Sequence, residues 1–206
     1  MMRFINHRIN TVTDLDSVPF ENGIELDVRY HNDELILHHD PFQHHKNNPE
    51  KLDYILEKWK HNGPLIINIK TEGIEKECIS MMDSYEIKNW FFLDMSMPFL
   101  VKYSLLTQGA NPILSPKNLA VRFSEFEPLE YALSFTGKAG WVWIDCFNKL
   151  PLTHEIYKQL KQSGFKICLV SPELQGHSLK QIPVFKDLIQ DMEIDAICTK
   201  RQDLWV

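Results

Sequence analysis

The feature that most constrains the fold is a regular alternation of short apolar runs with segments of helical periodicity. Eight apolar runs recur along the 206 residues, and most are followed by a segment whose apolar residues lie three or four positions apart, which predicts an amphipathic helix. Such alternation predicts parallel strands joined by crossover helices. Eight units predict a small (β/α)8 barrel of the TIM type. The predicted strands cover residues 2–7, 23–30, 65–69, 90–93, 119–121, 141–144, 165–170 and 196–199.

A further apolar run, residues 34–38, follows the turn sequence Asn32-Asp33 and predicts a hairpin with residues 23–30. No repeat or linker divides the chain, so we expect one domain over residues 1–206. A doubly wound open sheet is the alternative fold, although the GxGxxG dinucleotide fingerprint is absent from the sequence. The predicted helices cover residues 11–17 (about one turn), 50–61, 74–82, 98–106, 128–133, 153–160 and 179–189.

Polar residues follow the apolar runs where the predicted strands end. In a barrel of this type the carboxyl ends of the strands carry the active site. Trp141 and Trp143 alternate on one strand and therefore share a face. Core packing is expected for both, and Trp143, near the strand end, is also a candidate pocket floor. The polar residues at the strand ends are His7, Arg8, Glu25, Asp27, Asn68, Lys70, Asp94, Arg122, Asp145 and Ser171.

Glu25 and Asp27 interrupt an otherwise apolar strand. Residues two apart point the same way, roughly 6–7 Å apart along the strand. Buried carboxylates must be paired or bind a metal. Two readings stay open: an ion pair with Arg8, Arg29 or Lys70, or an oxygen-ligand site for Mg²⁺ or Ca²⁺. A nearby histidine would move protons near neutral pH.

Three short motifs occur in a fixed order: His7-Arg8, Glu25-x-Asp27 and His39-Asp40-Pro41. This ordered set resembles the glycerophosphodiester phosphodiesterase family. The segment 194–199, IDAICT, followed by Asp203-Leu204, is similar to the closing strand of that family. The resemblance spans the chain, and its specific part is residues 7–41.

The resemblance implies a barrel and hydrolysis of a glycerophosphodiester-like small molecule. His7 and His39 match the two catalytic histidines, with His39 as the acid and His7 as the base. Such a pair is needed because one group activates the nucleophile and another protonates the leaving alkoxide. On a regular strand only one of His38 and His39 points inward, and Asp40 is expected to orient the imidazole.

The remaining site residues also follow from the resemblance. Glu25 and Asp27 match the metal-binding pair, with Asn68 or water completing the site. Arg8 would bind a phosphate oxygen through its planar fork, unless it only compensates Glu25. Lys70 would neutralise a phosphate oxygen.

The chain departs from the family pattern at several positions. Ile9 stands where the family usually has glycine, so the loop after His7 is expected to approach a substrate less closely. Asn68 replaces a glutamate, which removes one negative charge from the metal site. Lys200 stands where aspartate is common. The segment between Pro41 and Pro64 is short and contains His44 and His45, which are expected to be solvated or to form part of a lid.

Composition excludes several classes of protein. The net charge of −6 contains no basic block, which argues against nonspecific nucleic-acid binding. The four cysteines show no CxxC spacing, so buried reduced thiols are expected. No run is long enough to span a membrane, and no signal-peptide core follows the N-terminus; a cytoplasmic protein of undetermined oligomeric state is expected.

Three functional hypotheses remain. The first is a metal-dependent phosphodiesterase. The second is a degenerate member of the family that binds a phosphorylated ligand without turnover, motivated by Asn68 and Ile9. The third is an unrelated barrel, such as a sugar-phosphate isomerase or lyase, in which Lys70 would be catalytic.

Overall fold

The computed structural model describes residues 2–41, 49–108 and 112–206. Within these ranges eight parallel strands follow the order β5-β4-β2-β1-β9-β8-β7-β6, and β3 pairs antiparallel with β2. The strands are β1 (Arg3–Asn6), β2 (Gly23–His31), β3 (Glu34–Leu37), β4 (Leu65–Ile69), β5 (Trp90–Leu93), β6 (Ala120–Phe123), β7 (Trp141–Ile144), β8 (Lys166–Val170) and β9 (Ala196–Thr199).

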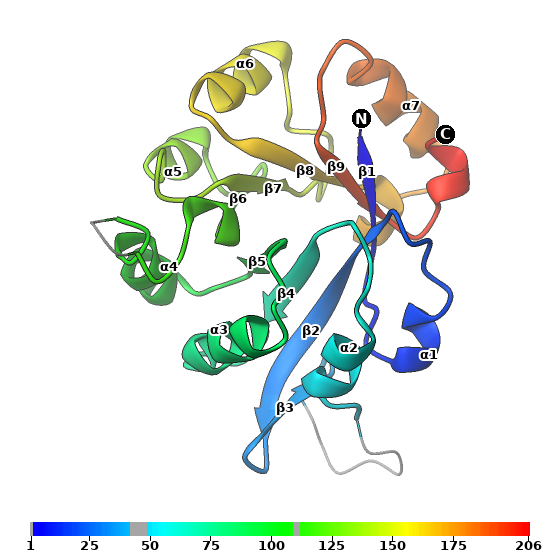
Figure 1. The fold of residues 1–206 in the computed structure, drawn as a ribbon. Helices are drawn as coiled ribbons and strands as arrows, with labels where there is room; N and C mark the ends of the chain where they lie inside the picture. Colours follow the sequence, from blue (N-terminus) through cyan, green and yellow to red (C-terminus); the bar gives the residue numbers. More distant parts are fainter. Residues whose placement is uncertain (1, 42–48, 109–111) are drawn as a thin grey trace.

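The sheet curls into a nearly closed barrel. β1 and β9, from the two ends of the chain, pair in parallel over four residues, Arg3 to Asn6 against Ala196 to Thr199. The two outer strands of the path, β5 and β6, meet at a bridge between Phe92 and Leu119. Figure 1 shows the strands around the centre and the helices at the periphery. The predicted TIM-type barrel is therefore confirmed, and the open doubly wound sheet is excluded.

The connecting helices follow the predicted order with shifted ends. The helix predicted over residues 50–61 is shorter in the structure and spans Leu52–Lys58. Glu50 lies outside the helix, and the Glu50 carboxylate accepts a hydrogen bond from the Val12 backbone nitrogen at 2.7 Å. No helix in the described ranges is long and apolar enough to cross a membrane. The helices are α1 (Val12–Leu15), α2 (Leu52–Lys58), α3 (Glu75–Ser84), α4 (Met97–Leu105), α5 (Leu129–Leu133), α6 (His154–Gln162) and α7 (Gln181–Leu188), with 3-10 turns η1 (Pro116–Asn118), η2 (Pro172–Gln175) and η3 (Gln202–Leu204).

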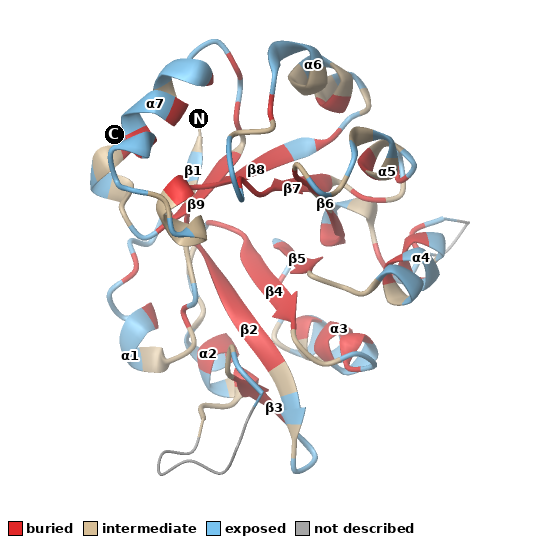
Figure 2. Cartoon of the chain, turned by 180° about the vertical axis from the view of Figure 1, so that it is seen from behind, coloured by how far each residue is buried: buried red, intermediate tan, exposed pale blue. Residues whose placement is uncertain are grey.

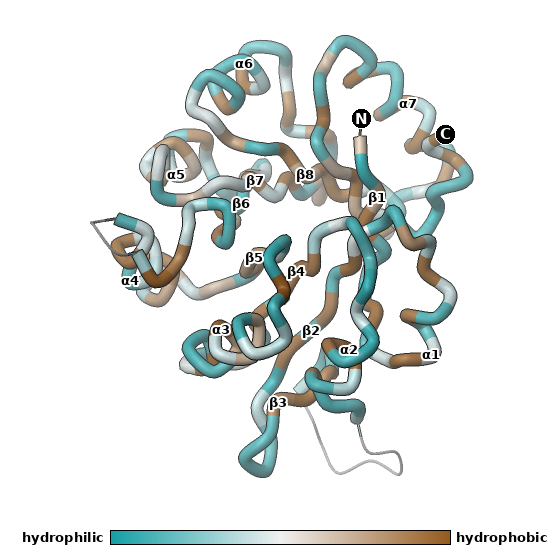
Figure 3. The backbone as a smooth tube through the Cα atoms, in the orientation of Figure 1, coloured by the Kyte–Doolittle hydropathy of each residue, from teal (hydrophilic) through white to brown (hydrophobic). Residues whose placement is uncertain are grey.

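The two faces of the strands build two hydrophobic cores. Side chains such as Ile24 and Leu26 pack outward against the helices. The alternate residues fill the barrel, where Phe91 stacks on Trp141 with ring centroids 4.8 Å apart. Figure 2 shows the strands as the buried part of the molecule, and Figure 3 shows hydrophilic stretches concentrated in the outer loops and helices. Trp141 and Trp143 both belong to the inner core, as expected. All four cysteines are buried and free, also as expected.

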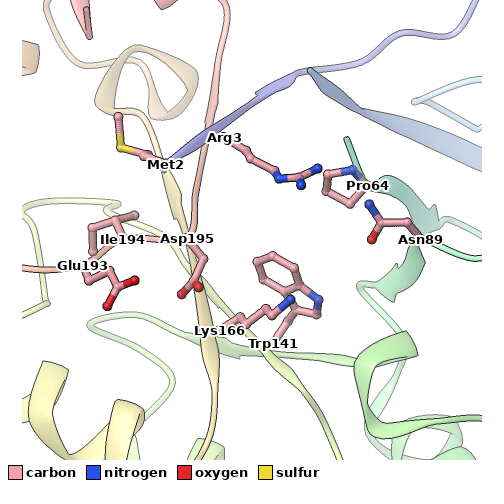
Figure 4. Close-up of a pocket in the computed structure, with 9 residues that line it drawn as sticks. All are labelled: Met2, Arg3, Pro64, Asn89, Trp141, Lys166, Glu193, Ile194 and Asp195. Atoms are coloured by element: carbon pink, nitrogen blue, oxygen red, sulfur yellow. The ribbon is translucent and has the colours of Figure 1, made fainter. Parts of the chain in front are cut away.

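The amino-terminal end of the barrel holds a cavity of about 180 Å³ (Figure 4). Three of its charged side chains, Arg3, Lys166 and Asp195, make contacts at this end. Asp195 accepts hydrogen bonds from Lys161 and from the Ile167 nitrogen. Lys166 lies over the Trp141 ring. This face therefore contributes to stability, and the chemistry-bearing residues lie at the opposite end.

Candidate active site

A polar cavity of about 170 Å³ lies at the carboxyl ends of the strands. Its walls come from strands distant in sequence, which the parallel barrel brings to one end. This placement brings eight of the ten polar strand endings to one cavity. Asp27 and Ser171 are not in its lining, and the buried Ser171 hydroxyl instead donates to Glu173 and accepts from Trp205 Nε1. The cavity is lined by His7, Arg8, Glu25, His39, Asn68, Lys70, Leu93, Asp94, Arg122, Trp143, Asp145, Val170, Leu174 and Gln175.

Strand register places the acidic pair beside Asn68. In the β2–β4 ladder Glu25 is opposite Ile66 and Asp27 is opposite Asn68. Ile66 belongs to the inner core, so the same face of β2 directs both carboxylates into the barrel. Asp27 is 0% exposed.

Hydrogen bonds compensate part of this buried charge. Glu25 accepts from Asn68 Nδ2 at 2.7 Å through Oε1 and from the Arg8 backbone nitrogen at 2.8 Å through Oε2. Burial, reinforced by the charge of Asp27, nevertheless raises the pKa of Glu25 to about 7. Lys70 Nζ lies 3.6 Å from Asp27 Oδ1. A cation close to Glu25 and Asp27 would relieve the remaining repulsion.

Two buried oxygens test whether the site suits a metal ion. Asp27 Oδ1 and Asn68 Oδ1 have no hydrogen-bond partner among the described residues. Both are hard oxygen donors on register partners, and Glu25 Oε1 contacts the same amide. This donor set fits Mg²⁺ or Ca²⁺. Among the described residues no group of three His, Cys, Asp or Glu side chains is placed to hold a metal ion, so a site at Glu25 and Asp27 would depend on the neutral amide of Asn68.

The turn after β1 aims His7 and Arg8 at the cavity. β1 ends at Asn6, so His7 lies just beyond the strand predicted to contain it. Arg8 has a φ of 56°, in the left-handed region. Ile9, in place of glycine, packs in the outer core, and its nitrogen bonds to the Glu25 carbonyl at 2.8 Å. The residue with the unusual conformation is therefore Arg8, and Ile9 fits without strain.

His7 is held in an environment that disfavours its charged form. Burial first, and then the charge of Arg8, lowers the pKa of His7 to about 3. Its Nε2 lies 3.8 Å from Glu25 Oε2, and its buried Nδ1 has no hydrogen-bond partner among the described residues. His7 is therefore a neutral imidazole beside the carboxylates.

His39, rather than His38, lines the cavity. β3 ends at Leu37, so strand alternation does not govern either histidine. The His39 Nδ1 lies 2.8 Å from Asp40 Oδ1, and its Nε2 lies 2.6 Å from Arg8 Nη2. Since arginine only donates, Nε2 accepts and Nδ1 carries the proton. Asp40 therefore orients His39, as expected. His38 turns toward the Asp40 carbonyl.

Two positioning residues escaped the sequence reasoning. The sequence predicted Arg29 as a possible partner for the carboxylates. In the structure its guanidinium donates to the backbone carbonyls of His38, His39 and Lys70 at 2.8–3.1 Å. Asn10 forms a reciprocal pair with Asp27, donating from Nδ2 to Oδ2 at 2.9 Å and accepting from the backbone nitrogen at 2.8 Å. No short motif marks either residue, because their partners are backbone groups and distant side chains.

An ion-pair network forms the far wall of the cavity. Arg122 contacts Asp94 at 2.7 Å, Asp145 at 2.5 Å and Glu127 at 3.3 Å. Its pKa is raised by these carboxylates, which outweigh its own burial. Burial raises the pKa of Asp145 to about 6 even beside Arg122. Lys70 Nζ joins the network through Asp94 at 3.1 Å.

Lys70 is thus ion-paired to two carboxylates rather than presented as a free amine, which disfavours the Schiff-base hypothesis. Trp143 belongs to the inner core and also forms part of the cavity wall. The two loop histidines, His44 and His45, lie outside the described residues.

No family model and no curated protein matches the sequence. Among solved structures, the fold is similar to a glycerophosphodiester phosphodiesterase from Agrobacterium tumefaciens, with a TM-score of 0.69, 14% identity and coverage of 100% of this chain and 99% of that chain. It is also similar to a glycerophosphoryl diester phosphodiesterase from Parabacteroides distasonis, with a TM-score of 0.55, 10% identity and coverage of 95% and 81%. The chain therefore has the fold implied by the resemblance of its motifs.

Proposed function

We propose that the protein hydrolyses a phosphodiester of the glycerophosphodiester type, using His7 and His39 as proton-transfer groups and a divalent cation held by Glu25, Asp27 and Asn68. One observation carries the proposal: His7 and His39, which lie on separate loops, line the same cavity with Arg8 and Lys70. This combination supplies two proton carriers and two cations for one phosphate.

Each residue has a role that follows from its surroundings. Arg8 and Lys70 would bind phosphate oxygens. His7 is neutral and would accept a proton from the nucleophile, with the Glu25 carboxylate, 3.8 Å from its Nε2, stabilising the imidazolium that forms. To act as the acid, His39 would take up a second proton at Nε2, exchange its contact with Arg8 for the departing alkoxide and donate that proton to it, while Asp40 at Nδ1 would stabilise the charged ring. When bound, Mg²⁺ or Ca²⁺ would add charge neutralisation on the phosphate.

The test is hydrolysis of bis(p-nitrophenyl) phosphate with EDTA, Mg²⁺, Ca²⁺ or Mn²⁺. We expect metal-dependent turnover that falls about 10²- to 10⁴-fold in His7→Ala and His39→Ala. His154→Ala, at an exposed position on α6, is the matched control and should keep wild-type activity. Equal turnover in all four proteins would overturn the two-histidine mechanism.

A second candidate is a phosphate-binding protein without turnover. Arg8 and Lys70 both line the cavity, and their positive charge would bind phosphate oxygens with or without a metal. Calorimetry with inorganic phosphate separates the two. Binding that is unchanged by EDTA, together with no turnover in any metal, would favour this second candidate.

A further inference from the structure

A groove of about 330 Å³, lined mostly by apolar residues, adjoins the catalytic cavity. The two share Asp94 and Arg122 in their walls. This ion pair, at 2.7 Å, is the partition between them. Apart from that pair and Glu127, the groove is lined by uncharged side chains: Met95, Met97, Leu100, Ala120, Phe126, Pro128 and Tyr131.

The groove follows the seam where the barrel fails to close. β5 and β6 are joined in the described ranges by the bridge between Phe92 and Leu119. Below the bridge, Asn118 Nδ2 caps the Trp90 carbonyl at 3.0 Å. Above it, Arg122 spans the seam to Asp94. Ala120, an inner-core residue of β6, also lines the groove, so the seam leads from the interior to the surface.

The loops beside the groove hold two phenylalanines in solvent. Phe126 is 71% exposed and Phe147 is 37% exposed, with ring centroids 5.8 Å apart. Hydrogen bonds fix their loops together. The Glu125 carboxylate accepts from the backbone nitrogens of Phe147, Asn148 and Lys149 at 2.7–3.2 Å. The exposed rings therefore lie in loops that hydrogen bonds hold together, and Phe126 lines the groove.

Polarity changes from one cavity to the other across the shared Asp94–Arg122 boundary. Arg8, Lys70 and the histidines lie at one end, and methionine and aromatic side chains lie at the other. The volume is near the lower end of the ~300–1,000 Å³ range of ligand pockets, which suits one apolar substituent. We propose that the substrate is a single-chain amphiphile, a phosphodiester in which one alcohol carries an alkyl chain that lies in the groove. This inference rests on the proposed function, because the phosphate occupies the catalytic cavity.

The first test measures binding without turnover. Calorimetry compares methyl phosphate with n-octyl phosphate, both below the aggregation concentration of the octyl ester. We expect the octyl ester to bind about 30-fold more tightly, since several methylenes leave water. Equal affinities would overturn the proposal. An advantage that arises only above aggregation, or only with phosphatidylcholine vesicles, would also overturn it, because the occupant would then be a lipid surface.

Matched variants locate the alkyl chain. Met97→Asp and Phe126→Ser alter exposed groove residues, so the fold should persist. In both, the octyl-to-methyl affinity ratio should fall to within about threefold. The ratio cancels any general effect of the new charge on phosphate binding. Leu188→Asp is the control, since Leu188 is 51% exposed on α7 and Met97 is 50% exposed. A ratio unchanged in both groove variants would overturn the groove assignment.

Turnover separates this inference from the proposed function. Methyl p-nitrophenyl phosphate and octyl p-nitrophenyl phosphate share a leaving group and differ only in the alkyl chain. Hydrolysis of both with equal kcat/KM would sustain the phosphodiesterase and overturn the groove. A binding preference for octyl phosphate without hydrolysis of either diester would sustain the groove and overturn the phosphodiesterase.

Discussion

At the scale of single residues, Asp40 decides which nitrogen of His39 faces the cavity. The Asp40 side chain is 76% exposed, and its Oδ1 accepts a hydrogen bond from His39 Nδ1 at an N–O distance of 2.8 Å. Asp40→Asn preserves shape but removes the charge that stabilises the imidazolium. We expect kcat to fall about 10- to 100-fold with little change in stability. Steady-state kinetics and thermal unfolding check this, with Asp191→Asn, an exposed position far along the chain, as control. An unchanged kcat would contradict the assignment.

Asn68 decides the charge of the proposed metal site. Asn68→Glu would place a third carboxylate beside Glu25 and remove the amide that now donates to Glu25 Oε1 at 2.7 Å. Like charges in a buried site repel. We therefore expect the variant to unfold at a lower temperature than wild type in EDTA and to regain stability with Mg²⁺ or Ca²⁺. Thermal unfolding with and without metal measures this.

Asn89→Glu, at the amino-terminal end of the barrel, is the control for Asn68→Glu and should show no metal response. Equal melting temperatures of Asn68→Glu in EDTA and in metal would mean that Glu25 and Asp27 do not form a cation site.

At the scale of elements, Arg29 ties three site segments together. It extends from β2 to the carbonyls of His38 and His39 and to that of Lys70 after β4. Hydrogen bonds from a charged donor contribute about 1.5–3 kcal/mol each. Arg29→Lys keeps the charge but loses the fork, so we expect kcat to fall at nearly constant KM, and Arg29→Met to lose more stability. Wild-type kcat in Arg29→Lys would contradict the positioning role.

Arg122, on β6, links the ends of β5 and β7 through Asp94 and Asp145. The loss of stability on replacing Arg122 should depend on pH. Asp145 is 2% exposed and would lose its 2.5 Å partner. Arg122→Gln should therefore cost about 3–5 kcal/mol near pH 8. Burial already raises the pKa of Asp145 to about 6. The folded state then keeps a proton that the unfolded chain releases near pH 4, so stability falls as pH rises through this range.

Without Arg122 the folded pKa of Asp145 is higher still, so the loss in Arg122→Gln should shrink at pH 5. Urea unfolding at both pH values measures it. Lys161→Gln, which breaks the more exposed pair with Asp195, should cost less than about 1 kcal/mol. A loss in Arg122→Gln that is equal at both pH values would argue against a buried Asp145 charge.

These elements show what sequence reasoning reaches. The strands were predictable because the residues on both of their faces are apolar. Glu25 and Asp27 stood out because they are charged residues within such an apolar strand. Arg29 and Asn10 were not predictable, since their roles depend on backbone groups that only the fold brings near. Arg122 was predicted just beyond a strand and instead lies within β6, because the apolar run ends at Val121 whereas pairing with β7 continues to Phe123.

At the scale of the whole molecule, the ends of the chain hold the barrel together. β1 and β9 pair along four residues, whereas β5 and β6, close in sequence, meet at one bridge in the described ranges. We propose that residues 1–206 form one domain, since removing either terminal strand would open a second seam. The seam between β5 and β6 was not predictable from periodicity, because it depends on strand curvature and not on composition.

The seam should be the least protected part of the barrel. Backbone amides that lack a ladder partner open locally at low free energy. We expect hydrogen exchange to be faster in peptides covering β5 and β6 than in those covering β1 and β9. Added octyl phosphate should slow exchange at β6 more than methyl phosphate does, because only its chain reaches Ala120 and Phe126. Equal protection of all four strands would mean that β5 and β6 close fully in solution, and the groove would then have no path from the interior.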